Sequence, residues 1–295
     1  MAMNVNYIDR ETGQVCTETV LGDRALRFAY ETLLGRALWP WLFYGRRASE
    51  LLGRYYDSRR SRRAVATLVS TPGLRVEEAE KPWTEYATFN EFFTRKLKPG
   101  SRPAAPGDRV LCAPADGRVL VYPGIDRAAA VPVKGAARSL EHLCGESLPD
   151  VRYDAAVIRL APVDYHRFHY PCACEQPREA RRIPGRYHSV NPIAFRRAPD
   201  VFTENARAVT NLASPVFGEF LYIEVGAFGV GSIVQTAGAG RHDKMAEKGF
   251  FKFGGSTVIL LLPAGWGEFD ADLRQNSRNG METLIRCGSR IGGMT

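Results

Sequence analysis

The residues best suited to chemistry are a serine after two glycines, two histidines three residues apart, and a carboxylate in a turn. They are Ser256 in K-F-G-G-S-T, His166 and His169 in D-Y-H-R-F-H-Y-P, and Asp116 in P-A-D-G. Histidine moves protons near neutral pH, and a neighbouring carboxylate can orient it. A serine hydroxyl becomes a nucleophile when a base removes its proton. The set therefore indicates nucleophilic chemistry that starts at Ser256.

The bond between Gly255 and Ser256 could itself be the target of this hydroxyl. Glycine at 254 and 255 permits strained backbone and close approach of the nucleophile. An N-to-O acyl shift, elimination of the Gly255 carboxylate and hydrolysis with loss of ammonia would turn the serine into a pyruvoyl group. Such a carbonyl is an electron sink for decarboxylating an amino acid. Taken alone, Gly-Gly-Ser before an apolar run is also an ordinary turn that precedes a strand.

Other interpretations of these motifs stay open on the residues alone. The Asp-Gly step of P-A-D-G is also a common structural turn. H-x-x-H could bind a metal, but no third ligand is evident, and the C-x-C of Cys172 and Cys174 lacks the second pair that structural zinc uses. We therefore expect no metal. The six cysteines do not form a disulfide framework for a chain of this size, which favours a reducing compartment.

The elements that must position these residues are predicted to be strands. Beyond Phe89 the chain consists of short apolar runs separated by glycine and proline, which is typical of an antiparallel β-sandwich or barrel. Asp116 lies between two such runs, the histidine pair follows the run 155–160, and Ser256 precedes the run 258–262.

The first part of the chain is predicted to be helical. Apolar residues recur at helical spacing from Asp23 to about Val69, with a break at Pro40 and a second helix from about Ala48. Ten arginines stand against three acidic residues between Arg24 and Arg63, and the whole chain carries a formal charge of +8. The segment could lie in a lipid headgroup layer, pack as a subdomain with a solvated basic face, or bind nucleic acid. No nucleic-acid module signature accompanies it.

Neither a secretory signal nor a membrane-spanning run is expected. Residues 1–14 are polar, and no stretch reaches the roughly 20 apolar residues that cross a bilayer. Contact with a membrane would therefore be peripheral.

Taken together, these segments resemble the phosphatidylserine decarboxylase family. The likeness runs in order from about Asn90 to Leu262 and is carried by N-E-F-F-T-R-K-L-K-P-G-S-R-P (90–103), P-A-D-G (114–117), D-Y-H-R-F-H-Y-P (164–171), S-V-N (189–191), N-A-R (205–207), V-G-A-F-G-V-G-S-I (225–233) and G-S-T (255–257). One departure is Ala206, where the family has glutamate. This position lies outside the catalytic set that the resemblance implies.

The resemblance implies a role for each residue. Ser256 is the precursor of a covalent pyruvoyl group, the cofactor, and Asp116 and His169 complete the relay that activates it. His166 acts on the substrate during decarboxylation. Cleavage between Gly255 and Ser256 gives a β chain (1–255) and an α chain (256–295). The substrate phosphatidylserine is then converted through a Schiff base to phosphatidylethanolamine and CO2.

The expected fold is α+β, with an N-terminal helical, membrane-associating region (1–85) packed on a mainly antiparallel β-rich catalytic domain (86–295). Implied partners are phosphatidylserine and an anionic membrane surface, with no nucleic acid. The β and α chains form a heterodimer, and two heterodimers could associate. The resemblance favours the cytoplasmic face of a bacterial cell membrane.

Three other functions are kept. One is an uncleaved Asp-His-Ser hydrolase, although the chain lacks the G-x-S-x-G elbow. The others are a non-catalytic peripheral membrane protein and a pyruvoyl decarboxylase for a soluble amino acid.

Overall fold

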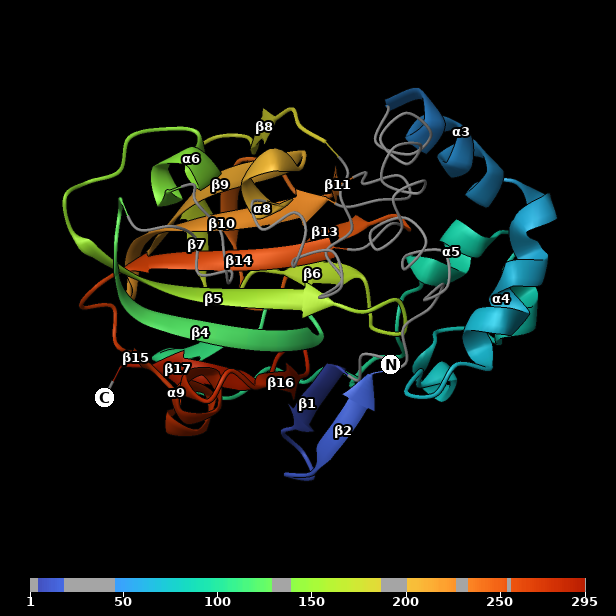
Figure 1. The fold of residues 1–295 in the computed structure, drawn as a ribbon, viewed down its shortest axis with the longest axis horizontal. Coiled ribbons are helices and arrows are strands. Elements are labelled where there is room, and N and C mark those ends of the chain that lie inside the picture. Colours follow the sequence, from blue (N-terminus) through green and yellow to red (C-terminus); the bar gives the residue numbers. More distant parts are fainter. Residues whose placement is uncertain are drawn as a thin grey trace, which may run out of the picture.

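The strand that begins at Ser256 lies in the middle of a large antiparallel sheet. The computed structural model of the chain describes residues 5–18, 46–128, 139–186, 201–226, 233–253 and 256–294. Strand β14 (Ser256–Pro263) pairs with β10 (Gly218–Gly226) on one side and β5 (Arg152–Leu160) on the other. Figure 1 shows these three strands crossing the centre of the molecule.

The main sheet has 11 strands in an open order. Beyond β10 come β9 (Arg207–Ser214), β7 (Cys174–Gln176) and β12 (Gly240–His242), with β8 (Arg181–Ile183) also paired to β9; beyond β5 come β4 (Gly117–Asp126), β16 (Glu282–Ile285), β1 (Val5–Asp9) and β2 (Val15–Glu18). All pairings are antiparallel except that of β1 with β16. Because the order runs openly from β12 to β2, the described strands do not close a barrel, and the predicted antiparallel core takes the form of packed sheets.

Two three-stranded sheets cover one face of the main sheet. They are β11 (Ile233–Gln235), β13 (Glu247–Phe251) and β6 (Arg167–His169), and β15 (Glu268–Phe269), β17 (Arg290–Gly293) and β3 (Val110–Cys112). Their buried side chains share one hydrophobic cluster with Val258 and Leu260 of β14. Short helices α6 (Leu140–Cys144) and α8 (Val201–Glu204) pack with Ile259 and Leu261 on the opposite face.

This layering explains the apolar run of β14. Successive side chains of a strand point to opposite faces, so a strand covered on both sides must be apolar at every position. Residues 258–262 are all at most 1 % exposed. Ser256 has the same parity as Val258 and therefore faces the small sheet that contains β6 and β13.

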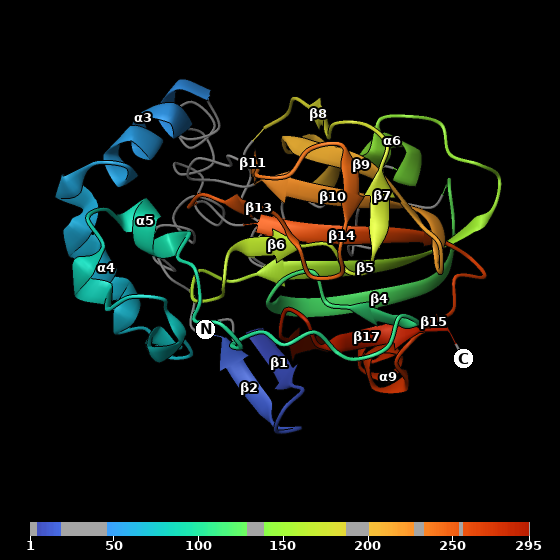
Figure 2. The ribbon, with the colours of Figure 1, turned by 180° about the vertical axis from the view of Figure 1, so that it is seen from behind.

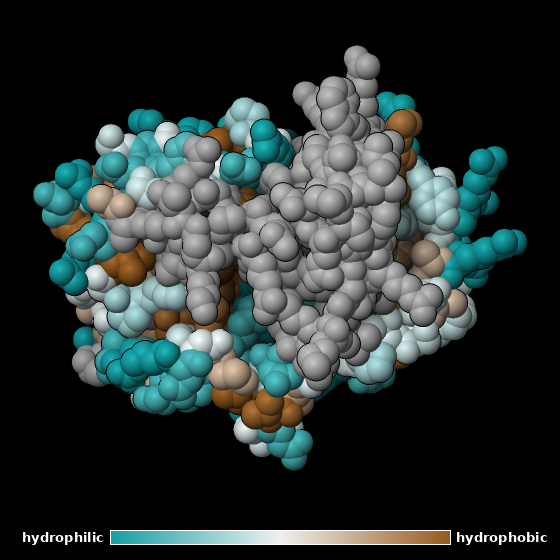
Figure 3. All heavy atoms as spheres, in the orientation of Figure 1, coloured by the Kyte–Doolittle hydropathy of each residue, from teal (hydrophilic) through white to brown (hydrophobic). Residues whose placement is uncertain are grey.

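A group of helices lies at one end of the sheets, at the right of Figure 1 and the left of Figure 2. It comprises α3 (Arg46–Tyr56), α4 (Arg62–Val69), α5 (Phe89–Phe93) and the 3₁₀ turns η1 (Arg59–Ser61), η2 (Val76–Glu78) and η3 (Trp83–Glu85). A third apolar cluster joins Val65 and Leu68 of α4 to the aromatic residues of α5. Hydrophilic side chains project along the outer edge of α3 and α4 (Figure 3).

The helix expected from about Ala48 is confirmed, but it does not run unbroken to Val69, because the chain turns at Asp57 and Ser58 between α3 and η1. The part of the predicted helical segment from Asp23 to residue 45 lies outside the described residues. In the described part of the chain, no helix is long and apolar enough to span a bilayer.

The C-terminal residues form two strands of different sheets, β16 and β17. Helix α9 (Ala271–Arg278) precedes them and packs on β4. The N-terminal strand β1 lies parallel to β16, so residues 5–18 are part of the main sheet.

Candidate active site

Ser256 is the first residue of β14 and is wholly buried. It lies opposite Gly226 of β10 and Leu160 of β5. Its exposed fraction is 0 %, and its Oγ has no hydrogen-bond partner among the described residues. A buried hydroxyl without a partner is uncommon, because it loses its hydration without compensation. Within the described part of the chain, no hydrogen bond of this oxygen therefore competes with a nucleophilic role. Gly254 and Gly255 lie outside the described residues.

The histidine segment follows the end of β5, the direct neighbour of Ser256 in the sheet. The backbone N–H of Phe251 donates to the carbonyl of His166 at 2.9 Å, and β13 pairs with β6. The chain that carries both histidines is therefore hydrogen-bonded to the strand that leads toward Ser256. The structure places His166 in the loop before β6 and His169 at the end of that strand.

His166 is a buried histidine whose two ring nitrogens have different surroundings. Its Nδ1 lies 2.9 Å from the backbone oxygen of Asp164, and because a carbonyl only accepts, Nδ1 must be the protonated nitrogen. Nε2 is buried and has no partner in the described structure. The ring packs on Phe93 with centroids 3.9 Å apart. Burial lowers the pKa of His166 to about 3, although the Asp164 carbonyl opposes this shift.

His169 has partners on both ring nitrogens. Nδ1 donates to the backbone oxygen of Met245 at 3.0 Å, and Nε2 accepts from the Tyr165 hydroxyl at 3.2 Å. Its backbone N–H donates to the oxygen of Pro114 at 2.8 Å, which joins the histidine segment directly to the P-A-D-G turn. Burial lowers the pKa of His169, opposed by the Met245 carbonyl and by the charges of Glu247 and Asp116.

Asp116 is buried at the start of β4, and its carboxylate faces an arginine. Arg102 donates through Nε to Oδ1 at 2.8 Å and through Nη2 to Oδ2 at 2.6 Å, and the Cys287 N–H donates to Oδ1 at 2.8 Å. Burial alone would raise the pKa of Asp116, but the hydrogen bonds and charge of Arg102 outweigh it, and the pKa is lowered. The structure thus brings Asp116 and His169 into adjoining segments. No hydrogen bond joins their side chains among the described residues.

A second buried ion network fixes the histidine loop. Arg118 of β4 pairs with the Asp164 carboxylate, which also accepts from the Ala161 N–H at 2.6 Å. On the same face, Arg159 of β5 binds Glu18 and Glu282, each at 2.6 Å. These ion pairs tie β2, β4, β5 and β16 together behind the loop that carries His166.

Sequence reasoning assigned no role to several residues that surround the site. Arg102 and Asn90 belong to the quoted segment 90–103 and Tyr165 to the segment 164–171, so each lay inside a segment already singled out. Their contacts join parts of the chain that are distant in sequence, and only the fold shows them. The Lys248–Glu224 pair was also missed. It is fully buried, with Nζ and Oε1 2.5 Å apart, between β13 and β10.

A cavity of about 320 Å³ opens beside His169. Lys96, Lys98 and Arg102 line it together with Tyr165, Met245 and Glu247. Arg102 is engaged by Asp116 and Glu78, whereas Lys96 and Lys98 are exposed and make no ion pair within the described residues. The cavity therefore presents two ammonium groups to solvent next to a proposed catalytic histidine.

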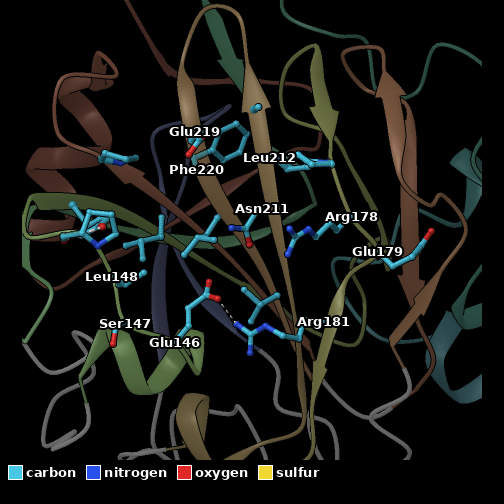
Figure 4. Close-up of a pocket in the computed structure, with 18 residues that line it drawn as sticks. Glu146, Ser147, Leu148, Arg178, Glu179, Arg181, Asn211, Leu212, Glu219 and Phe220 are labelled. Carbon is cyan, nitrogen blue, oxygen red and sulfur yellow. Dashed lines mark hydrogen bonds and ion pairs between the residues drawn. The ribbon is translucent and has the colours of Figure 1, made fainter.

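Two larger clefts lie elsewhere. One of about 620 Å³ is lined by residues of β5, β9, β10 and the segment 146–149, and Figure 4 shows its Glu146–Arg181 ion pair. The other, of about 640 Å³, lies beside α6. None of Asp116, His166, His169 and Ser256 lines either cleft.

The described residues contain no group of three or more His, Cys, Asp or Glu side chains that could hold a metal ion. All six cysteines are free thiols, and Cys172 and Cys174 are both buried.

Comparison with known proteins gives a consistent result. Residues 89–293 match the family model described as phosphatidylserine decarboxylase. The chain is 41 % identical over 297 residues to the phosphatidylserine decarboxylase proenzyme of Chlamydia trachomatis serovar D, covering 99 % of this chain and 98 % of the relative. It is 40 % identical over 296 residues to that of Chlamydia felis (98 % and 97 %) and 41 % over 290 residues to that of Chlamydia pneumoniae (97 % and 96 %).

Proposed function

Because the chain belongs to the phosphatidylserine decarboxylase family, we propose that it is a self-cleaving proenzyme that decarboxylates phosphatidylserine to phosphatidylethanolamine. The observation that supports this most is the environment of Ser256. A buried hydroxyl with no partner among the described residues begins a central strand, beside the segment that carries the buried His166 and the partly exposed His169. The uncleaved hydrolase is not favoured, because the relatives are named as proenzymes and the chain lacks the G-x-S-x-G elbow.

The proposed maturation uses groups of this chain alone. His169, oriented by the adjoining Asp116 turn, takes the Ser256 hydroxyl proton, and Oγ attacks the Gly255 carbonyl. The peptide C–N bond breaks as the C–O ester bond forms. Loss of the Ser256 Cα proton expels the Gly255 carboxylate, and addition of water to the resulting imine releases ammonia and leaves the keto group.

The interior around Ser256 suits a pyruvoyl group. A ketone has no proton to donate, so it needs no acceptor in surroundings where the Ser256 Oγ has no partner among the described residues. When present, the group supplies a carbonyl that takes the substrate amine and receives the electrons left by departing CO2. His166 is proposed to return a proton to the carbon that loses CO2. The proton would pass through Nε2, the ring nitrogen that has no partner among the described residues.

The cavity beside His169 is proposed to receive the phosphodiester of the headgroup. Lys96 and Lys98 carry the positive charges that an anionic phosphate requires, and neither has a competing ion pair in the described structure.

The two chains produced by cleavage are proposed to stay together. The α chain would begin with β14, which pairs with β5 of the β chain along its whole length and with β10 over residues 256–261. Its residues 256–262 are buried. Pulling this strand out would expose a large apolar area and two rows of backbone groups.

The helical end is proposed to dock on an anionic membrane at the cytoplasmic face of a bacterial cell. Helix α3 exposes Leu51 (65 %) and Tyr55 (47 %), and exposed arginines follow at 54, 59, 60, 62 and 63. Apolar and aromatic side chains beside arginines suit the headgroup layer.

Vesicle flotation tests this docking. Leu51→Asp should reduce flotation with phosphatidylserine-containing vesicles, whereas Val151→Asp, at an exposed valine before β5, should not. Equal loss in both variants, or in neither, would contradict it. Denaturing mass spectrometry tests the cleavage itself: wild type should give two chains, and Ser256→Ala one chain of 32.8 kDa.

A further inference from the structure

The backbone just before the proposed cleavage site is bound by one buried amide side chain. Asn90 of α5 accepts from the Phe253 N–H through Oδ1 at 3.0 Å and donates through Nδ2 to Asp57 Oδ1 at 2.9 Å. Lys252 Nζ binds the other oxygen of Asp57 at 2.9 Å. Asn90 is 3 % exposed. Two hydrogen bonds and an ion pair therefore join the turn after α3, helix α5 and the residues that follow β13.

Aromatic packing strengthens the same junction. The centroid of the Phe253 ring lies 4.7 Å from the ring centroid of Tyr56, 4.9 Å from that of Phe89 and 5.2 Å from that of Phe93. Phe93 also packs on His166. Helix α5 thus contacts both the segment that leads to Ser256 and the imidazole of His166.

The hydrogen bond between Asn90 and Phe253 lies close in sequence to the proposed cleavage site. Strand β13 ends at Phe251 and β14 begins at Ser256, so Phe253 lies between the two ladders. Its N–H finds its partner in Asn90. The carbonyl proposed to be attacked belongs to Gly255, two residues further on. Attack by a hydroxyl requires near-contact geometry, and a displacement of about 1 Å can cost about 100-fold in rate.

We propose that Asn90 is a positioning residue for self-cleavage, which holds the segment entering the Gly255–Ser256 bond against the helical end of the molecule. The inference rests on the proposed cleavage at that bond. Through Asn90 and Asp57, the N-terminal helices become part of the maturation machinery as well as a docking surface.

The chemistry of the amide makes the proposal specific. Asn90 donates to a carboxylate and accepts from a backbone N–H at once, which neither a carboxylate nor an alkyl side chain can do. Asn90→Leu keeps the approximate size and removes both bonds. Asn90→Asp keeps the acceptor for Phe253 but places a second carboxylate against Asp57. Adding Asp57→Asn to Asn90→Asp exchanges the amide and the carboxylate, and restores the hydrogen bond with its direction reversed.

The test follows the appearance of the α chain during cell-free synthesis of the full-length protein. Asn90→Leu and Asn90→Asp should split about tenfold more slowly than wild type, or slower. The exchanged pair should recover most of the rate lost by Asn90→Asp. The matched control is Glu91→Gln on the same helix, which lies in an exposed ion pair with Lys81 and should split within about twofold of wild type. Each Asn90 variant is also made in the Ser256→Ala background, so that thermal unfolding of the uncleaved chain can be measured.

The outcomes separate the two proposals. Slow splitting in folded Asn90 variants with recovery by the exchange supports the positioning role. Splitting of Asn90→Leu within about twofold of wild type would overturn it, as would slow splitting that occurs only where the Ser256→Ala partner has lost its cooperative unfolding, or an exchange that gives no recovery. If wild type fails to split, or Ser256→Ala splits, the proposed cleavage itself is wrong.

Discussion

Arg102 engages both oxygens of the Asp116 carboxylate, at 2.8 and 2.6 Å, although the two residues belong to different turns of the chain. The pair is almost fully buried, with side-chain exposures of 10 % for Arg102 and 1 % for Asp116. The ion pair keeps Asp116 ionised beside His169. Without Arg102, the buried carboxylate would have lost its main compensating charge.

Replacing Arg102 should destabilise the protein at neutral pH. Breaking a buried ion pair on one side costs about 3 kcal/mol, because the remaining charge is left uncompensated. Arg102→Met in the Ser256→Ala background should therefore lower the free energy of unfolding by about that amount in urea titrations at pH 7.

The pH dependence of this loss has a defined sign. The pKa of Asp116 is lowered in the folded protein, so the pair contributes stability above the pKa of the unfolded aspartate and loses it as pH falls through the folded pKa. The gap between Arg102→Met and its parent should therefore narrow below about pH 4. A gap that is constant from pH 7 down to pH 3 would show that Asp116 is not the group concerned.

His166 should remain neutral across the physiological range. Its pKa is lowered to about 3, whereas an unfolded histidine titrates near 6.5. The unfolded chain thus binds a proton that the folded chain does not, and His166 removes stability progressively as pH falls from about 6.5 toward 3. Nitrogen-15 NMR of histidine-labelled Ser256→Ala protein should show one imidazole with Nδ1 protonated and no titration between pH 5 and 8. Titration of all the histidines near pH 6.5 would contradict this environment.

Replacing His169 should impair cleavage of the chain, whereas replacing His166 should impair decarboxylation of the substrate. His169→Ala and Asp116→Asn should slow splitting of the chain by about 100-fold or more, since general base catalysis is worth about that much. His166→Ala should split and yet release little CO2 from phosphatidylserine. Gel analysis and CO2 release measure the two steps separately. A His166→Ala protein that decarboxylates normally, or a His169→Ala protein that splits normally, would reverse or remove the proposed roles.

The lysine-lined cavity should affect substrate affinity more than turnover. Lys96→Gln and Lys98→Gln should each raise KM for phosphatidylserine several-fold with kcat nearly unchanged, because a lost phosphate contact weakens ground state and transition state alike. Lys81→Gln removes the same charge from an exposed ion pair away from the cavity and serves as the control. Equal KM values in all three variants would place the headgroup elsewhere.

Removing one partner of the buried Lys248–Glu224 pair should lower the free energy of unfolding strongly. Replacing both partners with apolar side chains should lower it much less. Lys248 also bonds Thr210 and Gln235 and lies 5.0 Å from the Tyr222 ring centroid. Lys248→Met alone should cost about 3 to 5 kcal/mol, whereas Lys248→Met with Glu224→Leu should recover much of that loss. Urea unfolding in the Ser256→Ala background measures both. A double variant no more stable than Lys248→Met alone would contradict this expectation.

Local patterns in the sequence predicted much of the framework. The apolar run after Ser256 and the runs beside the other motifs are strands, because composition and turn residues determine those elements locally. The helix from about Ala48 follows from its spacing in the same way.

What sequence patterns could not give is long-range pairing. Asn90 and Phe253 are 163 residues apart, and the parallel pairing of β1 with β16 joins the two ends of the chain. The burial of Lys248 was also not predictable from local sequence. A lysine in E-K-G-F-F would ordinarily face solvent, yet Lys248 is fully buried because Glu224 on a neighbouring sheet compensates its charge. The different surroundings of His166 and His169 likewise depend on Phe93 and Met245, which come from other parts of the chain.

Denaturing mass spectrometry of the purified protein, after borohydride reduction in the presence of phosphatidylserine, tests the central claim most directly. The account predicts two chains divided before residue 256, with the lipid attached to the N-terminus of the smaller chain, and a single unmodified chain for Ser256→Ala. A single intact wild-type chain that keeps a serine at 256 while it decarboxylates phosphatidylserine would contradict it.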